Sequence, residues 1–315
     1  MKRLAVAATG TVLALTWSLS GCSAFDDSAT SADGVEVAAA FYPLQYVAER
    51  VAGAHATVDN LTAPGGEPHD LELTVKETAQ VAQADLVVYL HGFQPSVDDA
   101  VDTTAEGETF DVSEAVELRP AGAADHDHEH ADEGEEEGEE HDHGDTDPHF
   151  WQDPLLMADL GDELADRLAE IDPDHAGDLR DNAADLRGDL EALDAAYADG
   201  LARCERHAVV VAHDAFGYLS RYGLEFEPIA GLSPDAEPTP ADLAHLQEVI
   251  EEEGVTTVFY ESLVSPAIAE QLASDTGAKV AVLDPVEGLS DETADEDYLS
   301  LMEQNLAALE EANGC

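Results

Sequence analysis

Short apolar runs alternate with stretches of helical periodicity along most of the chain after Gly34. In the first half, the pattern predicts strands at 35–41, 56–62 and 86–90 and helices at 43–53 and 74–84. In the second half, it predicts strands at 207–212, 224–230, 255–260 and 279–283, with helices beginning near Phe216, Pro240, Pro266 and Asp297. Strands that alternate with helices are typical of mainly parallel sheets covered by helices. The chain is therefore predicted to be an α/β protein with two similar lobes.

A longer helical stripe separates the two series. Between about Asp174 and Arg203, apolar residues recur at helical spacing: Leu179, Leu186, Leu190, Leu193, Tyr197 and Leu201. About 30 helical residues span roughly 45 Å, enough to run across both lobes. The alternative is two helices with a break near Gly188. We assign 35–172 to an N-terminal lobe, 173–203 to a linking helix and 204–315 to a C-terminal lobe.

Residues 1–22 have the composition of an export signal, with Lys2 and Arg3 before an apolar stretch. That stretch is shorter than the about 20 residues that span a bilayer. The sequence LSGC at its end resembles a lipobox, in which cleavage leaves Cys22 as the lipid-bearing N-terminus. Residues 23–34 would then be a flexible tether, and the protein would be anchored to the outer face of the cell membrane. The alternative is cleavage elsewhere, with Cys22 an ordinary thiol.

If Cys22 carries lipid, Cys204 and Cys315 remain. An oxidising compartment favours the pairing of an even number of thiols. A disulfide between them would close a loop of about 111 residues, worth roughly 4 to 5 kcal/mol in the chain-entropy account. Two unpaired cysteines are the alternative.

The chain is strongly acidic, with 71 acidic against 12 basic residues and a net charge of −59. Only about 13 of the acids lie in 125–147, so the excess extends along the whole chain. Such a charge favours solubility at high ionic strength, as in a saline habitat. It also argues against a nucleic acid partner. The 44% hydrophobic content still supplies a core for two lobes.

Three histidines lie outside the predicted helices, near strand ends or in a stiffened loop. His69 follows an early strand in GGEPHD, His149 lies in DTDPHFWQDP, and His213 follows the strand at 207–212. Asp284 and Glu287 follow the last strand in LDPVEG. Ligands bind beyond the carboxyl ends of strands in open α/β sheets. Three imidazoles and one carboxylate suit tetrahedral zinc, although the long spacings form no local motif.

Four ordered motifs, GGEPHDLEL, DPHFWQDP, AHDAFGYLSRYGL and LDPVEGLS, make the chain similar to the metal-specific solute-binding proteins of ABC importers, which include zinc-binding periplasmic proteins. The resemblance implies two (β/α) lobes joined by one long rigid helix, with the metal between them. His69, His149 and His213 fall on the family's three ligand positions. It also implies a non-enzymatic, monomeric binding protein that captures Zn²⁺ and delivers it to a membrane permease driven by an ATPase.

The family pattern leaves the fourth ligand open. Glu287 is preferred, Asp284 is the alternative, and some zinc binders use water or a residue beside the first histidine, here Glu67. Family members that resemble manganese carriers place a glutamate at the position of His213, so the nitrogen favours zinc over manganese or iron. Gln152 stands where the family usually has leucine, which we expect to disturb packing slightly and coordination not at all.

The segment 121–147 contains no apolar residue larger than alanine, so we expect it to be disordered. It carries five histidines: His126, His128, His130, His141 and His143. Zinc-type members of the resembled family often have such a loop near the entrance, where weak binding would raise the local metal concentration. The alternative is a solvated acidic loop.

Two rival functions remain on the residues alone. Three histidines with an open position can activate water in a zinc hydrolase or lyase, but the chain lacks an HExxH motif. A surface adhesin role, sometimes attributed to family members, would add a partner without replacing metal binding.

Overall fold

The structure is a computed structural model that describes residues 34–122 and 146–315. The predicted signal peptide with Cys22 lies outside the described residues, as does the tether except Gly34. So do all five histidines of the predicted loop. At the end of that predicted loop, Thr146 and Asp147 form strand β6 (Thr146–Asp147), which pairs with β5 (Arg119–Pro120) in an antiparallel ladder. The prediction that residues 121–147 are disordered is therefore wrong for Thr146 and Asp147, which belong to a strand.

A four-stranded parallel sheet forms the N-terminal lobe, in the order β2-β1-β3-β4. Its strands are β1 (Val35–Ala39), β2 (Ala56–Asn60), β3 (Leu86–Tyr89) and β4 (Glu108–Asp111). Its helices are α1 (Tyr42–Ala52), α2 (Val75–Gln83), α3 (Pro95–Thr104) and the short η1 (Val112–Glu114). Thr74 and Glu77 form a capping box at the start of α2.

The C-terminal lobe repeats this plan with a second parallel sheet, ordered β10-β9-β7-β8. Its strands are β7 (Ala208–Val211), β8 (Glu225–Pro228), β9 (Thr257–Tyr260) and β10 (Lys279–Val282). Its helices are η4 (Gly217–Tyr222), α6 (Pro240–Glu252), α7 (Ala267–Thr276) and α8 (Tyr298–Asn313). The two predicted α/β lobes are thus confirmed, although the helix expected from Phe216 is a 3₁₀ helix.

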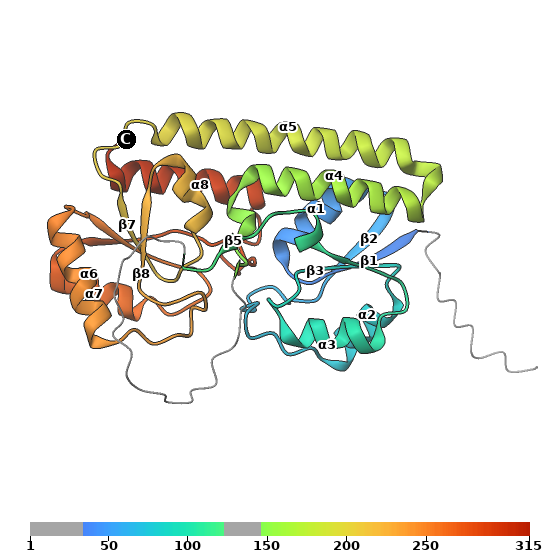
Figure 1. Cartoon of the computed structure of the whole chain (residues 1–315), viewed down its shortest axis with the longest axis horizontal. Helices are drawn as coiled ribbons and strands as arrows, with labels where there is room; N and C mark the ends of the chain where they lie inside the picture. Colours follow the sequence, from blue (N-terminus) through green and yellow to red (C-terminus); the bar gives the residue numbers. More distant parts are fainter. Residues whose placement is uncertain (1–33, 123–145) are drawn as a thin grey trace, which may run out of the picture. The chain divides into compact units, whose positions relative to one another are not determined.

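One long helix, preceded by a second helix of the N-terminal lobe, spans the two lobes (Figure 1). After η2 (Phe150–Gln152), α4 (Pro154–Ile171) leads through η3 (Pro173–His175) into α5 (Ala176–Leu201). Helix α5 is unbroken at Gly188, and every residue of its predicted apolar stripe is buried. It packs on α4 and α1 at one end and on α8 at the other. The fold class, two parallel-sheet lobes joined by a long helix, is the one predicted.

A disulfide joins Cys204 to Cys315. It ties the segment after α5 to the end of α8, where Glu205 N and Arg206 N also donate hydrogen bonds to Asn313 O at 3.0 and 3.1 Å. The predicted pairing of the two cysteines is therefore present in the structure.

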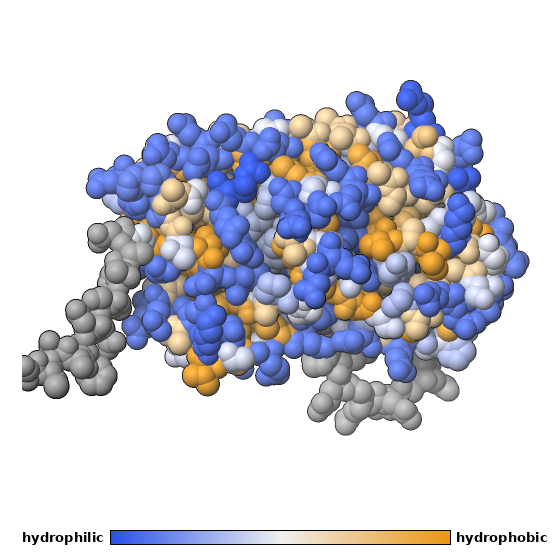
Figure 2. All heavy atoms as spheres, turned by 180° about the vertical axis from the view of Figure 1, so that it is seen from behind, coloured by the Kyte–Doolittle hydropathy of each residue, from blue (hydrophilic) through white to orange (hydrophobic). Residues whose placement is uncertain are grey.

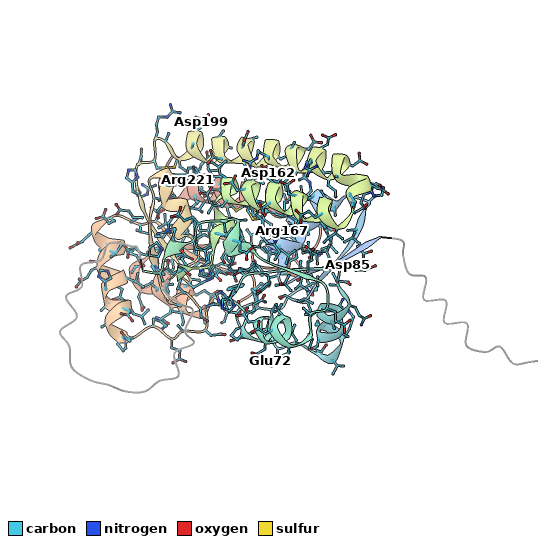
Figure 3. The ribbon with its side chains drawn as sticks, turned by 45° about the vertical axis from the view of Figure 1, so that its right-hand side comes forward. Glu72, Asp85, Asp162, Arg167, Asp199 and Arg221 are labelled. Carbon is cyan, nitrogen blue, oxygen red and sulfur yellow. A yellow bond between two sulfur atoms is a disulfide. The ribbon has the colours of Figure 1, made fainter. Side chains whose placement is uncertain are left out.

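Acidic side chains lie on the outside of both lobes and of the connecting helices. Those labelled in Figure 3 are all exposed: Glu72, Asp85, Asp162 and Asp199. On the face seen in Figure 2, hydrophilic residues cover much of the surface and hydrophobic residues lie between them in separate groups. None of the helices in 34–122 and 146–315 is long and apolar enough to cross a membrane.

Candidate metal centre

Four side chains from four separate segments meet between the lobes. His69 comes from the loop after β2, and His149 is the N-cap residue just before η2. His213 follows β7, and Glu287 lies in the loop after β10. Their donor atoms all lie within 4.8 Å of one another. The structure therefore brings together the three histidines and the preferred carboxylate of the sequence prediction.

Four of the six distances between these donor atoms match the edges of a tetrahedron around zinc. Glu287 Oε1 lies 3.5 Å from His69 Nε2 and 3.3 Å from the Nε2 atoms of both His149 and His213. The Nε2 atoms of His149 and His213 are 3.4 Å apart. A tetrahedron with bonds of about 2.0–2.1 Å has edges of about 3.3–3.4 Å. The four atoms can therefore coordinate one zinc ion with little rearrangement.

All four side chains are buried, and their charges are coupled. Burial lowers the pKa of His69. Burial also opposes protonation of His149 and His213, but facing carboxylates raise the pKa of both, that of His213 well above its usual range. Burial likewise opposes ionisation of Glu287, yet the three imidazoles hold its pKa well below its usual range. The site thus keeps one carboxylate ionised among nitrogen donors.

Two further carboxylates orient the imidazoles. Asp147 Oδ1 lies 2.8 Å from His149 Nδ1 and also accepts the backbone N–H of His149 at 3.0 Å. Glu261 Oε1 lies 2.6 Å from His213 Nδ1. With a carboxylate at Nδ1, each ring presents Nε2 to the centre, as metal-bound histidines commonly do. Neither carboxylate was identified from the sequence. Glu261, which directly follows β9, stands at the kind of strand end that pointed to His213.

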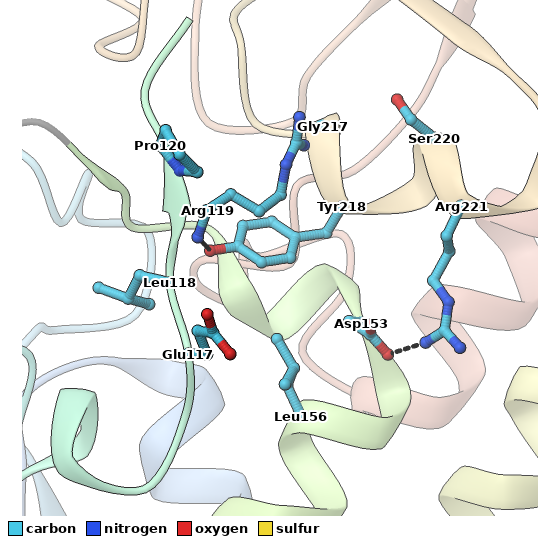
Figure 4. A pocket seen from close by; sticks show the side chains of 10 residues that line it. All are labelled: Glu117, Leu118, Arg119, Pro120, Asp153, Leu156, Gly217, Tyr218, Ser220 and Arg221. Carbon is cyan, nitrogen blue, oxygen red and sulfur yellow. Dashed lines mark hydrogen bonds and ion pairs between the residues drawn. The ribbon is translucent and has the colours of Figure 1, made fainter. Parts of the chain in front are cut away.

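Asp147 is itself held by Tyr218 and Arg119. Tyr218 Oη donates to Asp147 O at 2.8 Å and accepts from Arg119 N at 2.9 Å. The Arg119 guanidinium stacks over the Tyr218 ring and lies 3.7 Å from Asp147 Oδ2. Arg119 and Tyr218 also border a cavity of about 540 Å³ (Figure 4). The packing fixes the segment that carries His149.

The other candidate fourth ligands lie outside the group of four. Asp284 Oδ1 accepts from Val286 N at 2.7 Å, and its other oxygen accepts from Ser262 Oγ. Its carboxylate is therefore used to shape the loop that carries Glu287. Glu67 Oε1 lies 4.0 Å from His69 Nε2. Burial and the nearby charge of Glu287 raise the pKa of Glu67 to about 7.

A profile of the family described as "Zinc-uptake complex component A periplasmic" matches residues 37–312. The match covers both lobes and all four residues of the candidate site. The chain therefore belongs to this family.

Named relatives agree with the family match. The chain is 36% identical over 291 residues to the zinc-binding lipoprotein AdcA of Streptococcus pneumoniae, covering 89% of this chain and 56% of AdcA. It thus spans little more than half the length of that relative. It is 35% identical over 286 residues to the high-affinity zinc uptake system protein ZnuA of Bacillus subtilis, covering 89% of this chain and 88% of ZnuA.

A solved structure shares the same fold. The Zn(II)-bound ZnuA-like domain of S. pneumoniae AdcA superimposes with a TM-score of 0.73 at 32% identity. The superposition covers 90% of this chain and 100% of that domain. The similarity to AdcA thus lies in its ZnuA-like part.

Proposed function

We propose that this chain is the extracytoplasmic binding component of a zinc ABC importer. It captures Zn²⁺ between its two lobes and delivers the ion to a membrane permease driven by an ATPase. The observation that carries this proposal is the buried set of three Nε2 atoms and one carboxylate oxygen, with four of their six separations at 3.3–3.5 Å, close to the edge length expected for tetrahedral zinc. His69, His149, His213 and Glu287 are the proposed ligands. The family match to zinc-uptake components supports a transport role rather than an enzymatic one.

The donor chemistry favours zinc over the alternative cargoes, manganese and iron. Three neutral nitrogens and one oxygen suit zinc, whereas manganese prefers more oxygen ligands. The relatives named above are described as zinc-binding or zinc-uptake proteins, which agrees with this choice.

The proposal extends to the bounds of the lobes and to the parts of the chain outside the described residues. Cys22 carries a lipid anchor that holds a monomeric protein on the outer face of the membrane, a location supported by the LSGC sequence. The five histidines between His126 and His143 bind zinc weakly and raise its concentration near the site. Residues 35–172 and 204–315 act as the two lobes, with 173–203 as the linking segment.

The test is metal content by mass spectrometry after purification, together with competition titrations for zinc and manganese. We expect zinc to be retained and manganese to bind more weakly. His213→Glu replaces one nitrogen with oxygen and should shift the preference towards manganese. Equal occupancy by manganese and zinc in the unaltered protein would overturn the cargo assignment.

A further inference from the structure

The loop that presents Glu287 has a strained backbone. Val286 has φ 59°, and it is the sole non-glycine residue with positive φ in 34–122 and 146–315. A β-branched side chain rarely adopts this conformation, which persists where surrounding contacts enforce it. Val286 directly precedes Glu287 and is fully buried. The direction of the Glu287 side chain therefore depends on whatever holds this loop.

Hydrogen bonds hold the loop from both lobes. From the C-terminal lobe, the Asp284 side chain accepts a hydrogen bond from Val286 N. The Asn305 side chain accepts from Asp284 N at 2.9 Å and donates to Asp284 O at 2.6 Å. From η2, the buried side chains of Trp151 and Gln152 both donate to Pro285 O, at 2.8 and 2.5 Å. One carbonyl next to the strained residue thus accepts two hydrogen bonds from the opposite lobe.

His149 is the N-cap of the same short helix. This proposed zinc ligand from the N-terminal lobe directly precedes η2, and the last residue of η2, Gln152, holds the loop of the ligand from the C-terminal lobe. His149 and Glu287 are therefore tied together through the three residues of η2.

We propose that Gln152 is a positioning residue for zinc binding. Its amide, with the Trp151 indole, holds Pro285 so that the strained Val286 aims Glu287 at the three imidazoles. This inference rests on the proposed function, because it assigns a role within the same zinc site. Gln152 acts through Glu287 and makes no contact with the metal itself.

The test measures zinc affinity for Gln152→Met in two backgrounds, the unaltered chain and Glu287→Gln. Methionine is an unbranched side chain of similar size without the amide donor. We expect Gln152→Met to lower zinc affinity about tenfold in the otherwise unaltered chain, which is in the range seen for residues that orient metal ligands. In the Glu287→Gln background the loss should fall below about twofold, because interacting residues are not additive. Trp151→Phe removes the other hydrogen bond and should behave in the same way.

A spectroscopic reading and a matched control separate positioning from general stability. Visible absorption of the Co²⁺-loaded protein reports coordination geometry, and Gln152→Met should change it in the direction of Glu287→Gln. Asn313→Leu removes another buried amide, which donates to Leu309 O at 3.1 Å away from the site. It should lower the melting temperature without changing zinc affinity or the Co²⁺ spectrum.

The positioning role would be overturned if Gln152→Met lowered zinc affinity equally in both backgrounds. It would also be overturned if Gln152→Met did not lower zinc affinity in the otherwise unaltered chain. If the unaltered protein binds no zinc, the proposed function fails instead. Zinc binding that needs Glu287 but is indifferent to Gln152 would refute this inference alone.

Discussion

Two groups of side chains in the described part of the chain bring donor atoms close enough to share a metal ion, and they differ in chemistry. His69, His149, His213 and Glu287 are buried and supply three nitrogens. Glu67, Asp70 and Asp235 are part-buried or exposed and supply oxygens alone. The pKa of Asp235 is raised by its hydrogen bond to Asp70. The two groups are neighbours in sequence, since one loop carries Glu67, His69 and Asp70.

Proximity of donor atoms alone does not make a metal site. In the buried group, Asp147 and Glu261 fix two of the rings, and hydrogen bonds from both lobes hold the loop of Glu287. In the exposed group, like charges repel one another and are screened by salt. We therefore expect changes to the first group to alter zinc affinity far more than changes to the second.

Removing a ligand should have the largest effect. His213→Ala deletes a buried nitrogen donor at the centre of the group. Zinc affinity should fall by more than roughly 100-fold, which is the upper end of the loss seen when a residue that hydrogen-bonds to a metal ligand is changed. Competition against a chelator of known affinity measures it, with circular dichroism to check that the variant is folded. Retention of native affinity would remove His213 from the site.

Acid should weaken binding almost as much. Zinc binds neutral imidazole, so bound protons must be displaced. Burial opposes protonation of His213, but Glu261 and Glu287 raise its pKa well above its usual value, so protons compete with zinc for this ring already at pH above that usual value. Apparent affinity should therefore fall as pH falls, beginning above about 6.5, at about tenfold per pH unit for each proton displaced.

Titrations between pH 8 and pH 5 measure this dependence. The pKa of His69 is lowered by burial, so this ring competes for protons only in the more acidic part of the range. An affinity that stays flat across the whole range would contradict histidine ligation.

Loss of an orienting carboxylate should have a smaller effect. Glu261→Gln keeps the shape of the side chain but removes the charge that faces His213 Nδ1. Zinc affinity should drop about 10- to 100-fold, as is typical when such a partner is lost. Isothermal titration calorimetry at fixed pH checks it. A drop as large as that of His213→Ala would point to disruption of the whole site.

Neutralising the exposed acids should have the smallest effect. Asp70→Asn combined with Asp235→Asn should change equilibrium zinc affinity by less than about threefold, since exposed charges interact weakly through water. The same titration in low and high salt measures any residual effect. A change above tenfold would show that the exposed group takes part in binding.

Both sheets, the long helix and the three histidines could be predicted because each depends on a local pattern. The stripe from Leu179 to Leu201 and the strand end before His213 are visible in single segments. Helix α3 and strand β4 were missed because they bury few apolar residues, such as Val97 and Phe110. The segment 217–222 is only six residues long and ends at Gly223 in the left-handed region, too short to favour an α-helix.

The rest of the site depends on contacts between distant segments. Asp284 and Glu287 lie three residues apart in one loop, and the backbone angle of Val286 helps to set which of them faces the histidines. That angle is held partly by Gln152, whose departure from leucine was expected to affect packing alone. Sequence reasoning predicted the proposed ligands but not the hydrogen bonds that aim them.

We propose that His69, His149, His213 and Glu287 together hold one zinc ion. Anomalous diffraction at the zinc edge from crystals of the zinc-loaded protein tests it most directly. We expect one strong peak about 2.0–2.2 Å from each of the three Nε2 atoms and from an oxygen of Glu287. An anomalous peak beside Glu67, Asp70 and Asp235, or a zinc ion that Glu287 does not coordinate, would contradict this assignment of the ligands.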